Sequence, residues 1–131
     1  MKNHVTEMDT TFGPHLMLDL IGVEITKLSD IELHRTFLKE MPVHIDMTPI
    51  SELVLFHYTG LVSEDSGITG FQIIATSHIS IHSFEKKGYC FIDIFSCQHF
   101  DTDKAIEYIN QLFQPKKIEI NLCRRGLDFP R

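Results

Sequence analysis

The stretch "FQIIATSHISIHSFEKKGYCFIDIF" (71–95) decides the fold, because it holds three runs rich in β-branched and aromatic residues. In the second run Ile79 and Ile81 alternate with polar residues, as is typical of a strand with one buried face. The turn residues EKKG (85–88) separate the second run from the third, which predicts a β-hairpin. We therefore expect an antiparallel sheet at the centre of the protein.

The segments on either side predict two helices and further strands. A first helix is expected over 29–41, where Ser29 and Glu32 have the spacing of a capping box and Pro42 follows as a stop. Asp101 is expected to cap a second helix whose apolar residues share one face. Further strands are expected at 15–22, 52–60 and 116–126, with a turn-rich loop at 62–70.

The order strand, helix, four strands, helix, strand predicts an α/β fold of the α+β type. We expect a two-layer sandwich in which a largely antiparallel sheet carries both helices on one face. The other face then needs a cover, and a partner chain is the simplest candidate. The length of 131 residues predicts a single domain, 1–131, of which the polar residues 1–11 are expected to be flexible.

Composition narrows the classes of function. A formal charge of −6 disfavours binding to nucleic acid or to an anionic membrane, because like charges repel, so no such partner is expected. No run reaches the roughly 20 apolar residues that span a bilayer, and the first residues lack a signal peptide. The three cysteines, Cys90, Cys97 and Cys123, form no CxxC pair, which argues against a disulfide framework or a zinc site. We expect a cytoplasmic protein.

Taken one at a time, the polar residues of this region allow ordinary roles. Ser77 could be a plain strand residue, and His78 and His82 could be hydrogen-bonded sheet residues. The two histidines could also suggest a metal pair, but no third ligand of suitable spacing stands nearby, so no metal is expected. Cys97 could be a small buried side chain. The remaining residues are expected in ordinary places: Cys90 and Cys123 in the core, Arg124 and Arg125 as solvated charges.

The order and spacing of "GITGFQIIATSHISIHSFEKKGYCFIDIFSC" (67–97) resemble the prokaryotic S-adenosylmethionine decarboxylase proenzyme family. That family shows a G-[VI]-[ST]-G loop, an E-S-H-[LI]-[ST]-I-H strand and a D-[VI]-[FY]-[ST]-C strand. "FGPHLMLDLIG" (12–22) is similar to the family's opening F-G-x-H-L-x-L-D-L-x-G, and "CRRG" (123–126) to its closing segment. The resemblance runs from about residue 12 to the C-terminus without an evident gap.

The resemblance implies a pyruvoyl enzyme that cuts its own backbone before a serine and converts that serine into a covalent pyruvoyl group. The matching serine is Ser77, which implies cleavage of the Thr76–Ser77 bond into a β chain, 1–76, and an α chain, 77–131. The pyruvoyl group would supply the electron sink for decarboxylation of S-adenosylmethionine in spermidine biosynthesis.

By the same resemblance, His82 matches the base of the elimination step and Thr69 a hydroxyl that stabilises the tetrahedral intermediate. Cys97 matches the donor that reprotonates the substrate carbon. His82 follows Ser77 by five residues, so in a flat strand the two side chains point to opposite faces. We therefore expect a bend or bulge near Ser77.

Two departures from the family bear on processing and substrate. Thr76 stands where the family usually has Glu, and its β-branching crowds the carbonyl that Ser77 must approach. Glu85 and Lys86 stand where the family usually has Pro-Glu, whose Glu contacts the ribose hydroxyls. Phe12 and Phe84 are candidate surfaces for the adenine or the sulfonium, or ordinary core residues.

These departures leave two alternatives open. One is the same pyruvoyl chemistry on arginine or ornithine, which needs no ribose contact. The other is an unprocessed, non-catalytic homologue that binds a partner chain. In either enzymatic case the resemblance implies a homodimer with active sites between protomers.

Overall fold

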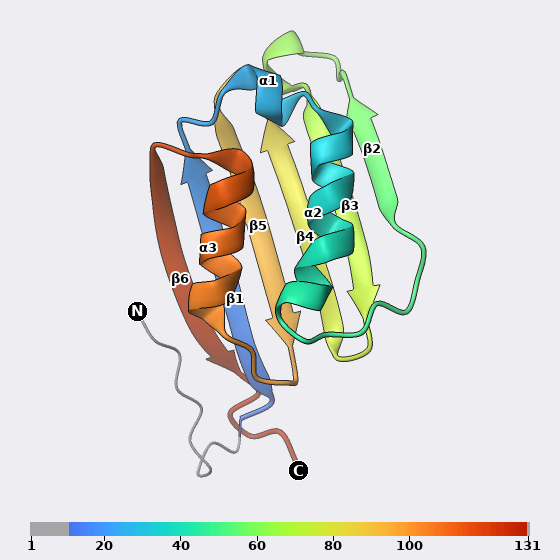
Figure 1. Ribbon diagram of the computed structural model, residues 1–131, viewed down its shortest axis with the longest axis vertical. Helices are drawn as coiled ribbons and strands as arrows, with labels where there is room; N and C mark the ends of the chain where they lie inside the picture. Colours follow the sequence, from blue (N-terminus) through green and yellow to red (C-terminus); the bar gives the residue numbers. More distant parts are fainter. Residues whose placement is uncertain (1–10, 131) are drawn as a thin grey trace.

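The computed structural model of the chain describes residues 11–130, and Figure 1 shows their arrangement. Flexibility was predicted for residues 1–11, of which residues 1–10 lie outside this part. No helix within residues 11–130 is both long and apolar enough to cross a membrane.

The sheet has six strands in the order β2-β3-β4-β5-β1-β6. All neighbouring strands pair antiparallel, so the predicted antiparallel sheet is confirmed. The turn EKKG (85–88) joins β4 to β5 as the predicted hairpin, with Phe84 opposite Tyr89. The strands are β1 (Gly13–Ile21), β2 (Val54–Tyr58), β3 (Gly67–Ile74), β4 (Ser77–Phe84), β5 (Tyr89–Ser96) and β6 (Lys117–Arg125).

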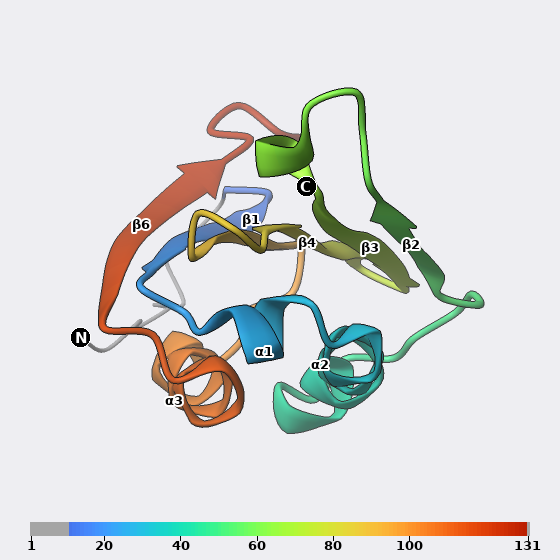
Figure 2. The ribbon, with the colours of Figure 1, turned by 90° about the horizontal axis from the view of Figure 1, so that it is seen from above.

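The helices pack together on one face of the sheet, as predicted (Figure 2). α2 (Ile31–His44) and α3 (Thr102–Phe113) are the two expected helices; a four-residue helix, α1 (Ile25–Leu28), was not predicted. A 3₁₀ turn, η1 (Ser63–Asp65), lies within the predicted loop. The core between the layers is formed by Leu16, Leu18 and Leu20 of β1, Ile79 and Ile81 of β4, Ile92 and Ile94 of β5, Phe37, Leu38 and Met41 of α2, and Ala105, Ile109 and Phe113 of α3.

The start and the end of α2 differ from the prediction. Asp30 is the N-cap, because its carboxylate accepts the backbone N–H groups of Glu32 and Leu33 at 3.0 and 3.2 Å. Ser29 instead donates to the carbonyl of Ile25 at 2.6 Å, which closes α1. Pro42 lies inside the helix rather than after it. Its own carbonyl accepts the N–H of Met47 at 2.7 Å, so the chain turns only beyond His44.

The opposite face of the sheet carries no α-helix of the described chain (Figure 2). We call it the open face. Directly paired residues share a face, so the pairing of Thr69 with His82 and of His82 with Phe91 assigns all three to it. Several large apolar side chains on this face are exposed: Val54, Phe56, Tyr58, Phe71, Ile73 and Phe91.

Candidate active site

The predicted cleavage point lies in the tight turn between β3 and β4. Ile74, the last residue of β3, pairs with Ser77, so Ala75 and Thr76 alone form the turn. The carbonyl oxygen of Thr76 accepts the backbone N–H of Cys97 at 3.0 Å. The carbonyl that Ser77 must attack is thus already polarised by a fixed donor, as an oxyanion site requires.

The side chain of Thr76 is also held. The hydroxyl of Ser96, which is fully buried, donates to Thr76 Oγ1 at 2.8 Å and accepts the backbone N–H of Gln98 at 2.9 Å. Thr76 Oγ1 in turn donates to Met47 Sδ at 3.3 Å. These contacts fix one rotamer of the β-branched side chain next to the cleavage point.

Gly13 allows the start of β1 to lie directly against the end of β5. A Cβ placed on Gly13 would meet the carbonyl oxygen of Ser96 at 2.0 Å. Only glycine can therefore bring the start of β1 against Ser96 and Cys97.

A second polar group lies at the other end of β4. Thr69 Oγ1 and His82 Nδ1 are 2.6 Å apart. The edge of the Phe84 ring packs against the His82 ring, with 4.7 Å between the centroids and 87° between the planes. The hydroxyl and the aromatic ring together fix the orientation of the imidazole on the open face.

The predicted bend or bulge near Ser77 is wrong. β4 pairs residue by residue with β5 from Ser77 opposite Ser96 to Phe84 opposite Tyr89, with no extra residue on either strand. Five residues of regular strand separate Ser77 from His82 by roughly 16 Å. Within one chain the site therefore consists of two groups: a cleavage half-site (Thr76, Ser77, Cys97) and a histidine half-site (Thr69, His82).

The aromatic candidates divide between these half-sites. Phe84 belongs to the histidine half-site. Phe12 lies at the other end of the sheet, where its ring contacts those of Phe95 and Phe129 at centroid distances of 5.5 and 4.8 Å. Arg125, which we predicted to be a solvated charge, places its guanidinium 4.4 Å from the centroid of Phe95, a cation–π contact.

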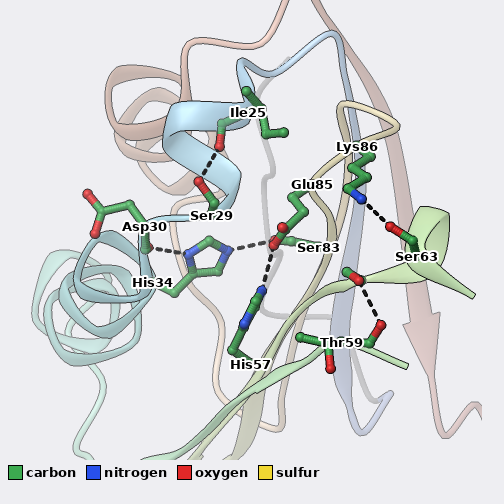
Figure 3. A network of polar contacts seen from close by, with 11 residues as sticks. Ile25, Ser29, Asp30, His34, His57, Thr59, Ser63, Ser83, Glu85 and Lys86 are labelled. Carbon is green, nitrogen blue, oxygen red and sulfur yellow. Dashed lines mark hydrogen bonds and ion pairs between the residues drawn. The ribbon is translucent and has the colours of Figure 1, made fainter. Parts of the chain in front are cut away.

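Glu85 and Lys86 point to different partners (Figure 3). A carboxylate oxygen of Glu85 lies 2.7 Å from Nε2 of His57, and only 12% of the Glu85 side chain is exposed. Lys86 contacts the hydroxyl of Ser63 in the 3₁₀ turn. The carboxylate of Glu85 is thus held by His57, a histidine that the sequence did not single out.

A buried polar group supports the histidine half-site from the helix side (Figure 3). His34 donates from Nδ1 to the carbonyl of Asp30 at 2.8 Å and accepts the hydroxyl of Ser83 at Nε2, 2.6 Å away. His34 and Ser83 are both fully buried, and burial lowers the pKa of His34 below its ordinary value although Asp30 opposes this shift. Because Ser83 lies between His82 and Phe84, this neutral histidine anchors their strand.

The three cysteines differ in environment. Cys90 is buried, as predicted, and burial raises the pKa of its thiol to about 12. Cys97 is half-buried beside the cleavage point, whereas Cys123 is exposed on β6 and its prediction as a core residue is wrong. Cys97 is therefore the cysteine whose location suits proton transfer at Ser77. Within residues 11–130 no three His, Cys, Asp or Glu side chains form a cluster that could hold a metal ion.

His78 is the residue that the sequence left without a role. Its Nδ1 lies 3.1 Å from the hydroxyl oxygen of Ser77. The signal was present, since His78 follows the matched serine directly, but a neighbour in a strand is expected on the opposite face.

Comparison with known proteins shows the family to which the chain belongs. The family model described as S-adenosylmethionine decarboxylase matches residues 14–126. The chain belongs to the S-adenosylmethionine decarboxylase family. It is 33% identical over 120 residues to the S-adenosylmethionine decarboxylase proenzyme of Persephonella marina, covering 91% of this chain and 86% of that protein. The proenzyme from Clostridium botulinum (strain Loch Maree / Type A3) is 35% identical over 115 residues, covering 87% and 94%.

The fold of the S-adenosylmethionine decarboxylase family is confirmed in the same way. The crystal structure of the adenosylmethionine decarboxylase from Aquifex aeolicus is similar with a TM-score of 0.76 at 29% identity, covering 90% of this chain and 93% of that one. The predicted family, a self-processing decarboxylase proenzyme that uses a covalent pyruvoyl group, is thereby confirmed.

Proposed function

We propose that this member of the family cuts its own Thr76–Ser77 bond, forms its pyruvoyl group from Ser77 and decarboxylates S-adenosylmethionine. The observation that carries the proposal is the hydrogen bond from the N–H of Cys97 to the carbonyl of Thr76 at 3.0 Å. This hydrogen bond places a donor on the carbonyl oxygen of the peptide bond that directly precedes the matched serine. The products would be chains 1–76 and 77–131.

In this proposal Cys97 is the proton donor in decarboxylation. Once formed, the pyruvoyl group supplies the electron sink for the charge that loss of CO2 leaves on the substrate. Cys97 follows Ser96, whose strand partner is Ser77, so its thiol lies on the segment next to the future pyruvoyl carbon. A thiol there can return a proton to the substrate carbon.

In this proposal His82 is the base of the elimination step. It removes the Cα proton of residue 77 after the ester has formed. For Nε2 to accept that proton, Nδ1–H must donate to the hydroxyl of Thr69, 2.6 Å away. In that tautomer Thr69 accepts the hydrogen bond and orients His82 so that Nε2 can act as the base.

We further propose a homodimer in which the open faces of two copies meet. One chain keeps its two half-sites roughly 16 Å apart, too far for His82 to reach its own Ser77. A two-fold axis crossing β4 would bring His82 of the partner subunit to the end of the open face at which β4 begins with Ser77 and His78, and so complete the site twice. The exposed apolar side chains of the open face also favour such a cover, since monomers rarely expose large apolar patches.

The substrate would lie between the half-sites. Glu85 is the candidate for the ribose hydroxyls; His57 holds one of its oxygens and leaves the other for a ligand. Phe84 and Phe12 are the candidate surfaces for the adenine or the sulfonium. We expect the enzyme to act in the cytoplasm.

Release of CO2 from carboxyl-labelled substrates tests the substrate assignment. We expect release from S-adenosylmethionine and none from arginine or ornithine. Release from a basic amino acid alone would contradict the assignment. A Ser77→Ala chain, which can form no pyruvoyl group, is the control for contaminating activity.

Co-expression tests the shared site. Neither Ser77→Ala nor His82→Ala should form a pyruvoyl group alone. A mixed dimer would join Ser77 of one chain with His82 of the other, so the His82→Ala chain should then mature. A His82→Ala chain that stays unmatured in isolated mixed dimers would contradict the shared site.

A further inference from the structure

His78 lies against the nucleophile of the cleavage reaction. Its Nδ1 is 3.1 Å from Ser77 Oγ, within the reach of proton transfer. The imidazole stacks on the Phe71 ring, with 5.1 Å between centroids and 24° between planes, and it meets the edge of Phe95 at 5.8 Å and 67°. Two aromatic rings from the neighbouring strands thus hold Nδ1 toward Ser77.

The surroundings of His78 favour its neutral form. Burial is the largest influence and lowers the pKa of His78 below its ordinary value. The charged groups that face it come from three strands: His15 of β1 and Arg125 of β6 lower the pKa further, and Asp93 of β5 raises it. The net effect leaves the imidazole free to accept a proton near neutral pH.

The first chemical step needs a base that His82 of the same chain cannot provide. The attack of Ser77 on the Thr76 carbonyl requires the hydroxyl to lose its proton. His82 lies roughly 16 Å along the strand, and Thr69 occupies its Nδ1. His78 is the imidazole that the described chain already places on the hydroxyl.

We propose that His78 is the general base that activates Ser77 for self-cleavage, an inference that rests on the proposed function. Ser77 Oγ bonds to the carbonyl carbon of Thr76 while its proton passes to Nδ1 of His78. The carbonyl electrons move to the Thr76 oxygen, which the N–H of Cys97 stabilises. The carbon–nitrogen bond to Ser77 then breaks, and His78 returns the proton to that nitrogen. The products are an ester and a free amine, with no added reactant.

Hydroxylamine separates this step from the later elimination, because it cuts esters readily and leaves ordinary amides intact. The full chain would be made by cell-free translation and sampled over time, with and without hydroxylamine, for intact-mass measurement. We expect His78→Gln to convert the Thr76–Ser77 amide to the ester about 100-fold more slowly than the wild type. This is the lower end of the effect expected for loss of a general base. We expect His82→Ala to accumulate a hydroxylamine-sensitive ester. Ser80→Ala, on the same strand and face, is the matched control and should convert like the wild type.

Two further measurements keep the inference falsifiable if His78→Gln folds poorly. In the wild-type chain the rate of amide loss should fall as the pH drops through the titration of His78, below its ordinary value of about 6.5. Added imidazole should restore conversion in His78→Ala, which a purely structural role would not allow.

Two results would overturn the inference about His78 and leave the proposed function intact. One is a folded His78→Gln chain that cleaves at the wild-type rate. The other is a wild-type rate of amide loss that does not change between pH 5 and about 7. A wild-type chain that never cuts at Thr76–Ser77 would overturn the proposed function as well.

Discussion

Replacing Ser96 by alanine tests whether the rotamer of Thr76 matters for self-cleavage. The Ser96 hydroxyl is fully buried, donates to Thr76 Oγ1 at 2.8 Å and accepts the N–H of Gln98 at 2.9 Å. Without it two hydrogen bonds are lost, one to Thr76 and one to Gln98, and each contributes about 1 kcal/mol. We therefore expect the free energy of unfolding to fall by about 2 kcal/mol.

The effect on cleavage follows from the freed side chain. Thr76 would regain other staggered rotamers, some of which place its methyl group toward the path of Ser77 Oγ. If the native rotamer is held by about 1.4 kcal/mol, conversion should slow about tenfold. Intact-mass time courses measure the rate, and thermal unfolding confirms that the variant is folded.

A matched variant isolates the hydroxyl. Ser96→Thr keeps the donor and the acceptor, so it should cleave faster than Ser96→Ala although the added methyl group strains the core. Folded Ser96→Ala with the wild-type cleavage rate would refute the reasoning, because it would show that the contact with Thr76 is irrelevant to the attack.

Three more outcomes are expected. The free energy of unfolding should fall as the pH drops below about 6.5, because the unfolded state then protonates His34 while the folded state keeps it neutral. His34→Gln should be about 1–3 kcal/mol less stable at neutral pH, and its urea midpoint should depend less on pH than that of the wild type. The same pH dependence in the variant and the wild type would contradict this. Cys97→Ala should still cleave, since its backbone N–H remains, but CO2 release should fall at least tenfold; normal turnover would exclude the thiol as proton donor. His57→Ala should raise KM for S-adenosylmethionine several-fold with little change in kcat, whereas an unchanged KM would show that its contact with Glu85 does not position a substrate ligand.

The sheet could be predicted because its signals are local. Alternation in the two runs before and after EKKG assigns each side chain to a face, and the pairing of Phe84 with Tyr89 follows from the turn. The helix ends were less certain because Ser29 and Asp30 are both capping residues. Only the packing of α1, which engages the Ser29 hydroxyl, decides in favour of Asp30.

The residues of the site could be named from the sequence, but their distances could not. The spacing of Ser77, His82 and Cys97 identifies the family, yet only the pairing register shows that β4 is regular and that Ser77 and His82 stand apart. The contact between His34 and Ser83 joins residues 49 positions apart, which no local pattern reveals.

The mass of the C-terminal chain tests the central claim most directly. If Ser77 becomes a pyruvoyl group, freshly purified protein should yield a fragment 77–131 that is lighter by one ammonia than the same peptide beginning with serine, and that resists Edman degradation. A folded protein that retains the uncut chain of 15.1 kDa, or a fragment that begins with an ordinary serine, would contradict the account.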